Sequence, residues 1–70
     1  MRRKIIQSSN IRSIGFESNV LEIEFNTGLV YQYYPVSEYQ YHEMMNAKSK
    51  GQYFLRYIRN NISIQQKRII

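Results

Sequence analysis

The chain of 70 residues is long enough for one small domain, which on folding would bury about 60% of the surface of its unfolded chain. It has no cysteine, which excludes disulfide bonds and cysteine-containing zinc clusters, so seven tyrosines and three phenylalanines must supply much of the packed area. The net charge of +5 favours partners that carry negative charge.

No apolar run approaches the roughly 20 residues that a membrane-spanning helix needs. The basic start at residues 2–4 is similar to the first part of a signal peptide, but the apolar part that follows ends after Ile5 and Ile6. A signal peptide needs roughly 7–15 apolar residues at this point. We therefore expect a cytoplasmic protein.

Charge is segregated along the chain into three blocks. Residues 1–16 carry four basic residues and no acid, residues 17–47 carry all five acids and no lysine or arginine, and residues 48–70 carry six basic residues and no acid. If the fold brings the two ends together, the result is a positive face that attracts phosphate groups. The alternative is a solvated surface that serves only solubility.

In chain order, residues 1–7 are expected to form a mobile basic arm, since only two isoleucines could hold them. Residues 11–16 are a strand candidate, in which Gly15 weakens the strand or marks a bulge. Residues 17–19 have the composition of a turn. Residues 20–25 form the clearest strand, because apolar side chains alternate with two glutamates, as in a strand with one face in water.

A hairpin loop follows at residues 26–28, and its length decides where the next strand points its tyrosines. A two-residue loop would set Tyr31 and Tyr33 opposite the glutamates on the solvent face, whereas a three-residue loop sets them opposite Ile23 and Leu21. We favour the three-residue loop, because a glycine stands at its third position, where a left-handed backbone is required. In this register the two tyrosines belong partly to the core.

Pro35 ends this strand, and two helices follow. Ser37 is a good N-cap with a glutamine three residues on, as in a capping box, which predicts a helix over residues 38–47. Ser49 has the same arrangement and predicts a second helix from about residue 50 to residue 60. The side chains predicted to face inward are Tyr41, Met44 and Met45 on the first helix and Tyr53, Phe54, Tyr57 and Ile58 on the second.

The order of the elements predicts an α+β fold. A three-stranded antiparallel meander followed by two short helices packed on one face (β-β-β-α-α) buries both apolar helix stripes. The domain would span residues 8–60, and residues 61–70 would form a basic C-terminal tail. Within that tail, Ile62 and Ile64 flank a serine, so an additional edge strand remains an alternative.

Several short pieces, in their order along the chain, resemble the KTSC domain, a family named from the C-terminus of some lysyl-tRNA synthetases and also found as free-standing bacterial and phage proteins. The resemblance covers residues 8–60 and departs from the family at Pro35, which stands one residue earlier than usual. The family is uncharacterised and suggested to bind RNA, so the resemblance implies a small RNA-binding domain. The pieces are Ser8-Ser9-Asn10-Ile11 with Ile14 and Phe16, the strand at residues 21–25, Gly28, Tyr31 and Tyr33 as Tyr-x-Tyr, and Ser49, Lys50 and Gly51 followed by Tyr53 and Phe54.

Catalysis is not expected, and no cofactor is implied. His42 is the only histidine, and the acids are too dispersed to complete a metal site with it, so we interpret it as a surface residue of the first helix. Glu22 and Glu24 point the same way along one strand, which strand alternation explains without any chemistry. The chain has no phosphate-binding glycine loop and no nucleophile motif. We predict a protein that is not an enzyme and holds no metal.

Nucleic-acid binding through the second helix is the function we favour. RNA-binding modules stack unpaired bases on aromatic side chains while arginines and lysines hold the phosphates. The start of the second helix also points free N–H groups outward, whereas the two glutamates count against the outer face of the sheet. The residues predicted to contact nucleic acid are Arg12, Lys48, Lys50, Arg56, Arg59 and Tyr34.

The alternative is a protein-interaction module without catalysis. The third strand is expected to be a sheet edge, and Val30 and Tyr34 leave it partly apolar, which favours pairing with a second copy or a partner protein. Salt distinguishes the two functions, because phosphate binding weakens steeply with ionic strength and an apolar edge contact does not. No small-molecule substrate and no membrane contact are expected.

Overall fold

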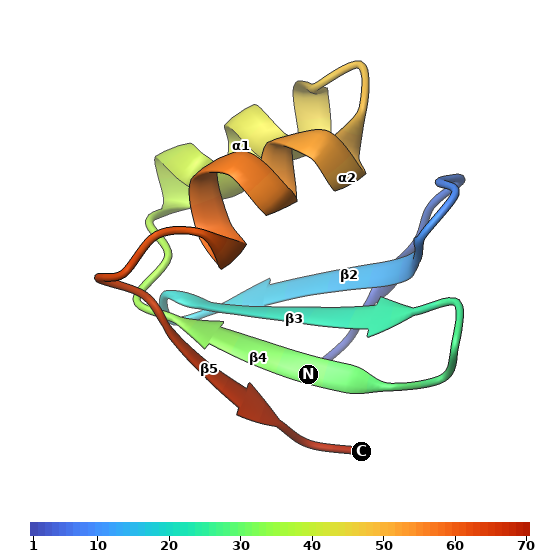
Figure 1. Cartoon of the computed structure of the whole chain (residues 1–70), viewed down its shortest axis with the longest axis horizontal. Helices are drawn as coiled ribbons and strands as arrows, with labels where there is room; N and C mark the ends of the chain where they lie inside the picture. Colours follow the sequence, from blue (N-terminus) through green and yellow to red (C-terminus); the bar gives the residue numbers. More distant parts are fainter.

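A computed structural model describes all of residues 1–70 as a five-stranded antiparallel sheet with the helices on one face (Figure 1). The strands follow one another across the sheet in chain order. No helix is both long and apolar enough to cross a membrane. The elements are β1 (Lys4–Ile5), β2 (Ile11–Glu17), β3 (Val20–Phe25), β4 (Val30–Tyr34), α1 (Glu38–Asn46), α2 (Lys50–Tyr53), which continues directly as the π-helix η1 (Phe54–Arg59), and β5 (Gln65–Arg68).

The α+β class and the helices on one face are confirmed, but the prediction of three strands is wrong. The two additional strands, β1 and β5, lie in the segments expected to be an arm and a tail. Every residue of both strands is exposed, so main-chain pairing alone defines them and no apolar alternation marks them in the sequence. The C-terminal strand also begins after Ile64, beyond the alternation at residues 62–64.

Because β5 pairs with β4, the third predicted strand is not a sheet edge, and the edge surface expected there does not exist. Val30 is only 2% exposed, and its main chain bonds to Ile69 and Ile70. The free edges are β1, which is two residues long, and β5, which carries Lys67 and Arg68. Charged side chains on an edge strand disfavour pairing with another chain.

The hairpin between β3 and β4 has the predicted three-residue loop. Leu21 pairs with Tyr33 and Ile23 pairs with Tyr31, which is the register that turns both tyrosines toward the helices. Gly28 has a φ of +94°, the left-handed backbone that this loop requires, and its N–H donates to the Phe25 carbonyl oxygen at 2.9 Å. One glycine therefore fixes the face on which the tyrosines lie.

Gly15 allows the N-terminal segment to cross β2 closely. A Cβ atom at this position would lie 2.9 Å from the Arg2 carbonyl oxygen and 3.0 Å from the Arg3 Cγ. The irregularity in the pairing of β2 lies instead between Ile11 and Ser13. Gly15 thus serves close approach rather than a bulge.

The approach of Arg3 builds a polar network on the face of the sheet away from the helices. Arg3 forms an ion pair with Glu22 and donates from Nε to the Ser13 hydroxyl at 3.0 Å. Gln32 donates to the second oxygen of Glu22 at 2.8 Å, and Ser13 donates to Glu24 at 2.8 Å. These bonds allow Glu22 to be only 7% exposed and leave the two glutamates with separate partners.

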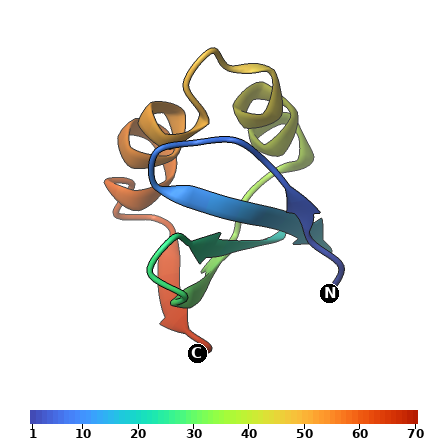
Figure 2. The same ribbon diagram turned by 90° about the vertical axis from the view of Figure 1, so that its right-hand side faces the viewer.

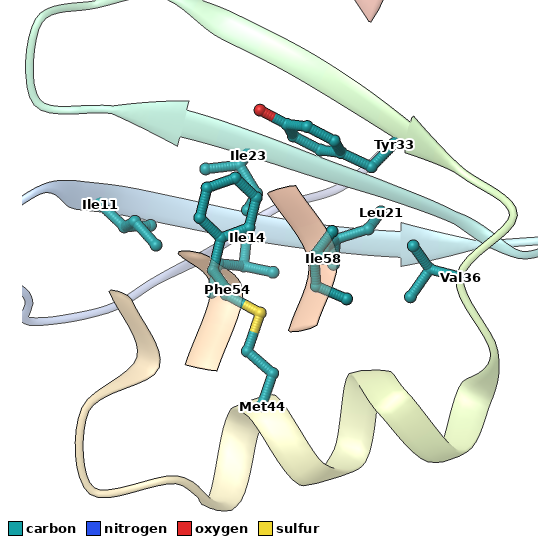
Figure 3. Packing of buried hydrophobic residues seen from close by; sticks show 9 residues of the cluster. All are labelled: Ile11, Ile14, Leu21, Ile23, Tyr33, Val36, Met44, Phe54 and Ile58. Atoms are coloured by element: carbon teal, nitrogen blue, oxygen red, sulfur yellow. The ribbon is translucent and has the colours of Figure 1, made fainter. Parts of the chain in front are cut away.

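The core lies between the sheet and the helices, where side chains from β2, β3, β4 and both helical segments meet (Figure 3). It confirms Tyr33 as a core residue, and Tyr31 packs partly buried against it. The buried cluster consists of Ile11, Ile14, Leu21, Ile23, Tyr33, Val36, Met44, Phe54 and Ile58.

The predicted cap of the first helix is confirmed. The Ser37 hydroxyl accepts from the Gln40 N–H at 3.0 Å, and the Gln40 side chain accepts from the Ser37 N–H at 3.0 Å. Met44 is fully buried, and Tyr41 stacks on Phe16 with ring centroids 4.7 Å apart. These contacts hold α1 over β2 and β3.

The second helix begins as predicted, with the Ser49 hydroxyl accepting from the Gln52 N–H at 3.2 Å. Its inward face is only partly as predicted: Phe54 and Ile58 are buried, but Tyr57 is 48% exposed. The reason is the π geometry of η1, in which the Asn60 N–H donates to the carbonyl oxygen five residues earlier. The wider turn rotates Tyr57 out of the apolar stripe.

Candidate functional site

A pocket of about 540 Å³ opens between η1 and the strands β3 to β5. In Figure 2 the two helices lie side by side above β2, and β5 runs away from them. Five separate segments of the chain contribute to the pocket. Its walls are Ser9, Asn10, Ile11, Phe25, Asn26, Thr27, Leu29, Tyr31, Tyr33, Gly51, Phe54, Leu55, Arg59 and Gln66.

Four aromatic rings form one connected wall of the pocket. Tyr31 lies between Phe25, whose ring meets it edge-on with centroids 6.0 Å apart, and Tyr33, whose ring is within 24° of parallel at 6.3 Å. Phe54 from η1 meets Tyr33 edge-on at 5.0 Å. Tyr33 and Phe54 are buried, whereas Tyr31 and Phe25 are half-buried and present ring surface to the pocket. Such a wall can take a flat ring.

Tyr33 supplies a neutral polar group to this wall. It is only 2% exposed, and burial raises the pKa of its hydroxyl to about 12, although the charge of Arg59 acts in the opposite direction. The hydroxyl therefore keeps its proton at neutral pH.

Arg59 is the single charged residue of the pocket wall, and none of the five acids of the chain contributes to it. Its side chain is exposed at the end of η1. A pocket with one guanidinium group and no carboxylate favours an anionic or neutral ligand over a cation.

The other predicted contact residues do not line this pocket. Arg12, Lys48 and Arg56 are exposed elsewhere on the surface, and Lys50 is half-buried at the start of α2. Arg56 and Arg59 are both exposed on η1, but only Arg59 lines the pocket.

Tyr34 lies on the wrong face to act with Arg59. It follows Tyr33 directly in β4, so the two side chains point to opposite faces of the sheet. Tyr34 is 53% exposed and pairs with Gln65 of β5.

The polar rim of the pocket was not predicted from the sequence. The Asn26 Nδ2 donates to the Ser9 carbonyl oxygen at 2.9 Å, and the Asn26 N–H donates to the Asn10 carbonyl oxygen at 2.9 Å. These bonds join the β3–β4 loop to the segment before β2. Gln66 enters from β5. One signal in the sequence could have indicated this site: most of the pieces that carry the family resemblance contribute residues to the pocket.

A second hollow, of about 740 Å³, lies between the two helices and carries the opposite charge. Tyr39, Tyr53, Tyr57 and Glu43 line it, and no lysine or arginine does. The Tyr53 and Tyr57 rings lie 4.7 Å apart, and partial burial together with the charge of Glu43 raises the pKa of Tyr53. The second helix is therefore flanked by one basic and one acidic hollow.

His42 lies exposed on α1 with its Nε2 3.7 Å from the Glu38 carboxylate, four residues earlier. No group of three or more histidine, aspartate or glutamate side chains converges in the structure.

The fold and the pocket define a small α+β domain in which separated sequence pieces meet at one aromatic site. The chain belongs to the KTSC domain family, whose sequence model matches residues 7–61. Members of this family share a small domain whose function is uncharacterised. A crystal structure of a KTSC domain protein from Yersinia pestis superimposes with a TM-score of 0.87 at 34% identity, over 99% of this chain and 97% of that one.

Proteins of two kinds are similar to this chain in sequence. An uncharacterised protein of Stutzerimonas stutzeri is 38% identical over 56 residues, which cover 77% of this chain and 79% of that protein. A lysine–tRNA ligase of Trichormus variabilis is 37% identical over 62 residues, which cover 86% of this chain but 11% of the ligase. The domain is thus similar both to a protein of about its own length and to a small part of a much larger enzyme.

Proposed function

We propose that this KTSC domain binds RNA on the side of the second helix that carries Arg59. The observation that supports this most directly is the pocket in which four aromatic rings stand beside one arginine and no acid. Aromatic faces stack with bases, and arginine pairs with phosphate, so this combination is typical of sites for single-stranded nucleic acid.

Charge and relationship add support. The segment after residue 47 holds no acid, so the field around the second helix is positive except at the hollow formed with α1. Among the relatives are lysine–tRNA ligases, enzymes whose name specifies tRNA. An appended domain that contacts RNA would suit such an enzyme.

The test is a titration with a mixed pool of structured and single-stranded RNA at about 50 and then 200 mM salt. Arg59→Glu should lower the affinity about tenfold or more. It should also reduce the slope of log K against log salt concentration by about 1, the value expected for one lost phosphate contact. Lys67→Glu is the matched control, since it also reverses one exposed charge. Lys67 lies in β5 opposite Gln32, on the face of the sheet away from the helices. Equal binding by the two variants, both folded, would contradict this site.

A second candidate function is the binding of a partner protein. With the β4 edge covered, it depends on the hollow between the helices, where Tyr39 and Tyr57 are exposed large aromatic side chains. No RNA binding at 50 mM salt, together with association that Tyr57→Ala weakens, would favour this candidate over RNA.

A further inference from the structure

The pocket beside Arg59 has the size of a small-ligand site. Its volume of about 540 Å³ lies within the roughly 300–1,000 Å³ that such sites have. Half of its wall residues are hydrophobic, and the polar ones include amide and hydroxyl groups. A flat ligand with a polar edge fits this composition better than an aliphatic one.

In the aromatic wall, the Tyr31 ring faces the pocket and is packed against neighbouring aromatic rings. Tyr31 is half-buried and lines the pocket, while Tyr33, stacked against it, is locked by Phe54 at 5.0 Å. Phe25 packs against Tyr31 close to a right angle, with the ring planes 74° apart and the centroids 6.0 Å apart. The free surface of Tyr31 is therefore presented in a fixed orientation, which lowers the entropic cost of stacking a second ring on it.

Hydrogen-bonding groups stand around this platform. The donation from Asn26 Nδ2 to Ser9 orients that amide and leaves its oxygen as an acceptor. Asn10 and Gln66 add amide groups, each with a donor and an acceptor. The edge of an unpaired base presents complementary donors and acceptors, whereas in a duplex its Watson–Crick edge is already paired.

We infer that the pocket receives one unpaired RNA base stacked on Tyr31, with the neighbouring phosphate paired to Arg59. This inference rests on the proposed function and adds to it a selectivity, because a base inside a duplex cannot enter the pocket. RNA loops and single-stranded ends are the class of ligand that results. A regular duplex would bind only through its phosphates.

The experiment compares a single-stranded RNA 10-mer with a duplex of the same length, and adds AMP, UMP and ribose 5-phosphate as competitors. The full chain should bind the single strand at least about tenfold more tightly than the duplex. AMP or UMP should compete at millimolar concentration and shift the Tyr31 ring resonances, while ribose 5-phosphate should do neither, because it has no base.

Tyr31→Ala should lower the affinity for the single strand by about 5- to 150-fold, the range expected for one stacked base. Tyr34→Ala is the control, since it removes the same side chain from the opposite face of β4 and should leave the affinity unchanged. Tyr31→Phe keeps the ring and should retain most of the binding. Should Tyr31→Ala not fold, the competition experiment on the unaltered chain still decides the outcome.

The outcomes separate the inference from the function on which it rests. Absence of any RNA binding at 50 mM salt overturns both. Salt-dependent binding that Arg59→Glu weakens, with equal affinity for duplex and single strand and no effect of Tyr31→Ala, keeps the function and overturns the base pocket. AMP binding as tight as that of the 10-mer would identify a free nucleotide as the ligand and overturn the assignment to RNA.

Discussion

Tyr33 shows how one side chain can serve the core and the pocket at once. Its ring belongs to the buried cluster and contacts Phe54, while the residue also lines the pocket that contains Arg59. The raised pKa of its hydroxyl, about 12, means that the fold stabilises the neutral phenol. Burial of this ring should therefore make the domain less stable at alkaline pH, where the hydroxyl ionises.

Alkaline pH should destabilise the domain through the Tyr33 hydroxyl. The folded pKa of about 12 lies above the ordinary value of 10.0, so the contribution of Tyr33 is complete below pH 10 and is lost as the pH rises through 12. Between pH 9 and pH 11 the unaltered chain should lose roughly 1 kcal/mol of unfolding free energy through this group. Urea unfolding at the two pH values measures the loss.

Tyr33→Phe should lack this part of the alkaline loss, because the ionisable hydroxyl is gone. Tyr34→Phe is the control, since Tyr34 is 53% exposed and its removal should leave the pH dependence unchanged. An identical alkaline loss in the unaltered chain and in Tyr33→Phe would disprove the assignment.

At the scale of the element, the π-helix η1 decides which residues of the second helix reach the core and which reach the pocket. Phe54 and Ile58 are buried in it, Tyr57 is exposed, and Arg59 lines the pocket whereas Arg56 does not. π-turns occur frequently at functional sites. Here the wider turn belongs to the helix that supplies the single arginine of the pocket.

Alanine substitutions at Ile58 and Tyr57 test which of the two side chains contributes to the core. Ile58→Ala should cost about 2–5 kcal/mol of unfolding free energy, because Ile58 is 1% exposed and its removal leaves a cavity. Tyr57→Ala should cost about 1 kcal/mol or less, the value expected for an exposed aromatic pair such as Tyr53 and Tyr57. Chemical unfolding of both variants gives the comparison, and a larger cost for Tyr57 would indicate an α-helical inward stripe instead.

At the scale of the whole molecule, the two ends of the chain complete the sheet. β1 and β5 add main-chain pairing and no buried side chains, yet they cover the edges of β2 and β4. β5 also supplies Gln66 to the pocket. A domain of this size gains by covering its edges, because an unpaired and partly apolar strand recruits other chains.

Removing residues 65–70 should therefore expose the β4 edge and Val30. The shortened chain should associate more strongly than the full chain at equal concentration, and it should unfold at a lower temperature. Sedimentation velocity and thermal unfolding measure the two effects. Ile62→Ser is the control, since Ile62 is fully exposed and lies outside β5. A shortened chain that stays as dispersed as the full chain would contradict the protective role of β5.

Features that depend on local chemistry were predictable from the amino-acid sequence. Alternation defined the strand at residues 20–25, Gly28 set the register that turns Tyr31 and Tyr33 toward the helices, and serine caps started both helices. These signals are readable because each depends on residues close together in the chain.

The remaining features depend on contacts between residues that are far apart in the chain. β1 and β5 exist through main-chain bonds to distant strands, which leave no side-chain pattern. The π turn of η1 emerged only in the packed structure and placed Arg59 at the pocket without Arg56. The pocket itself requires five segments to meet where the sheet twists away from the helices, and no local stretch of sequence contains that geometry.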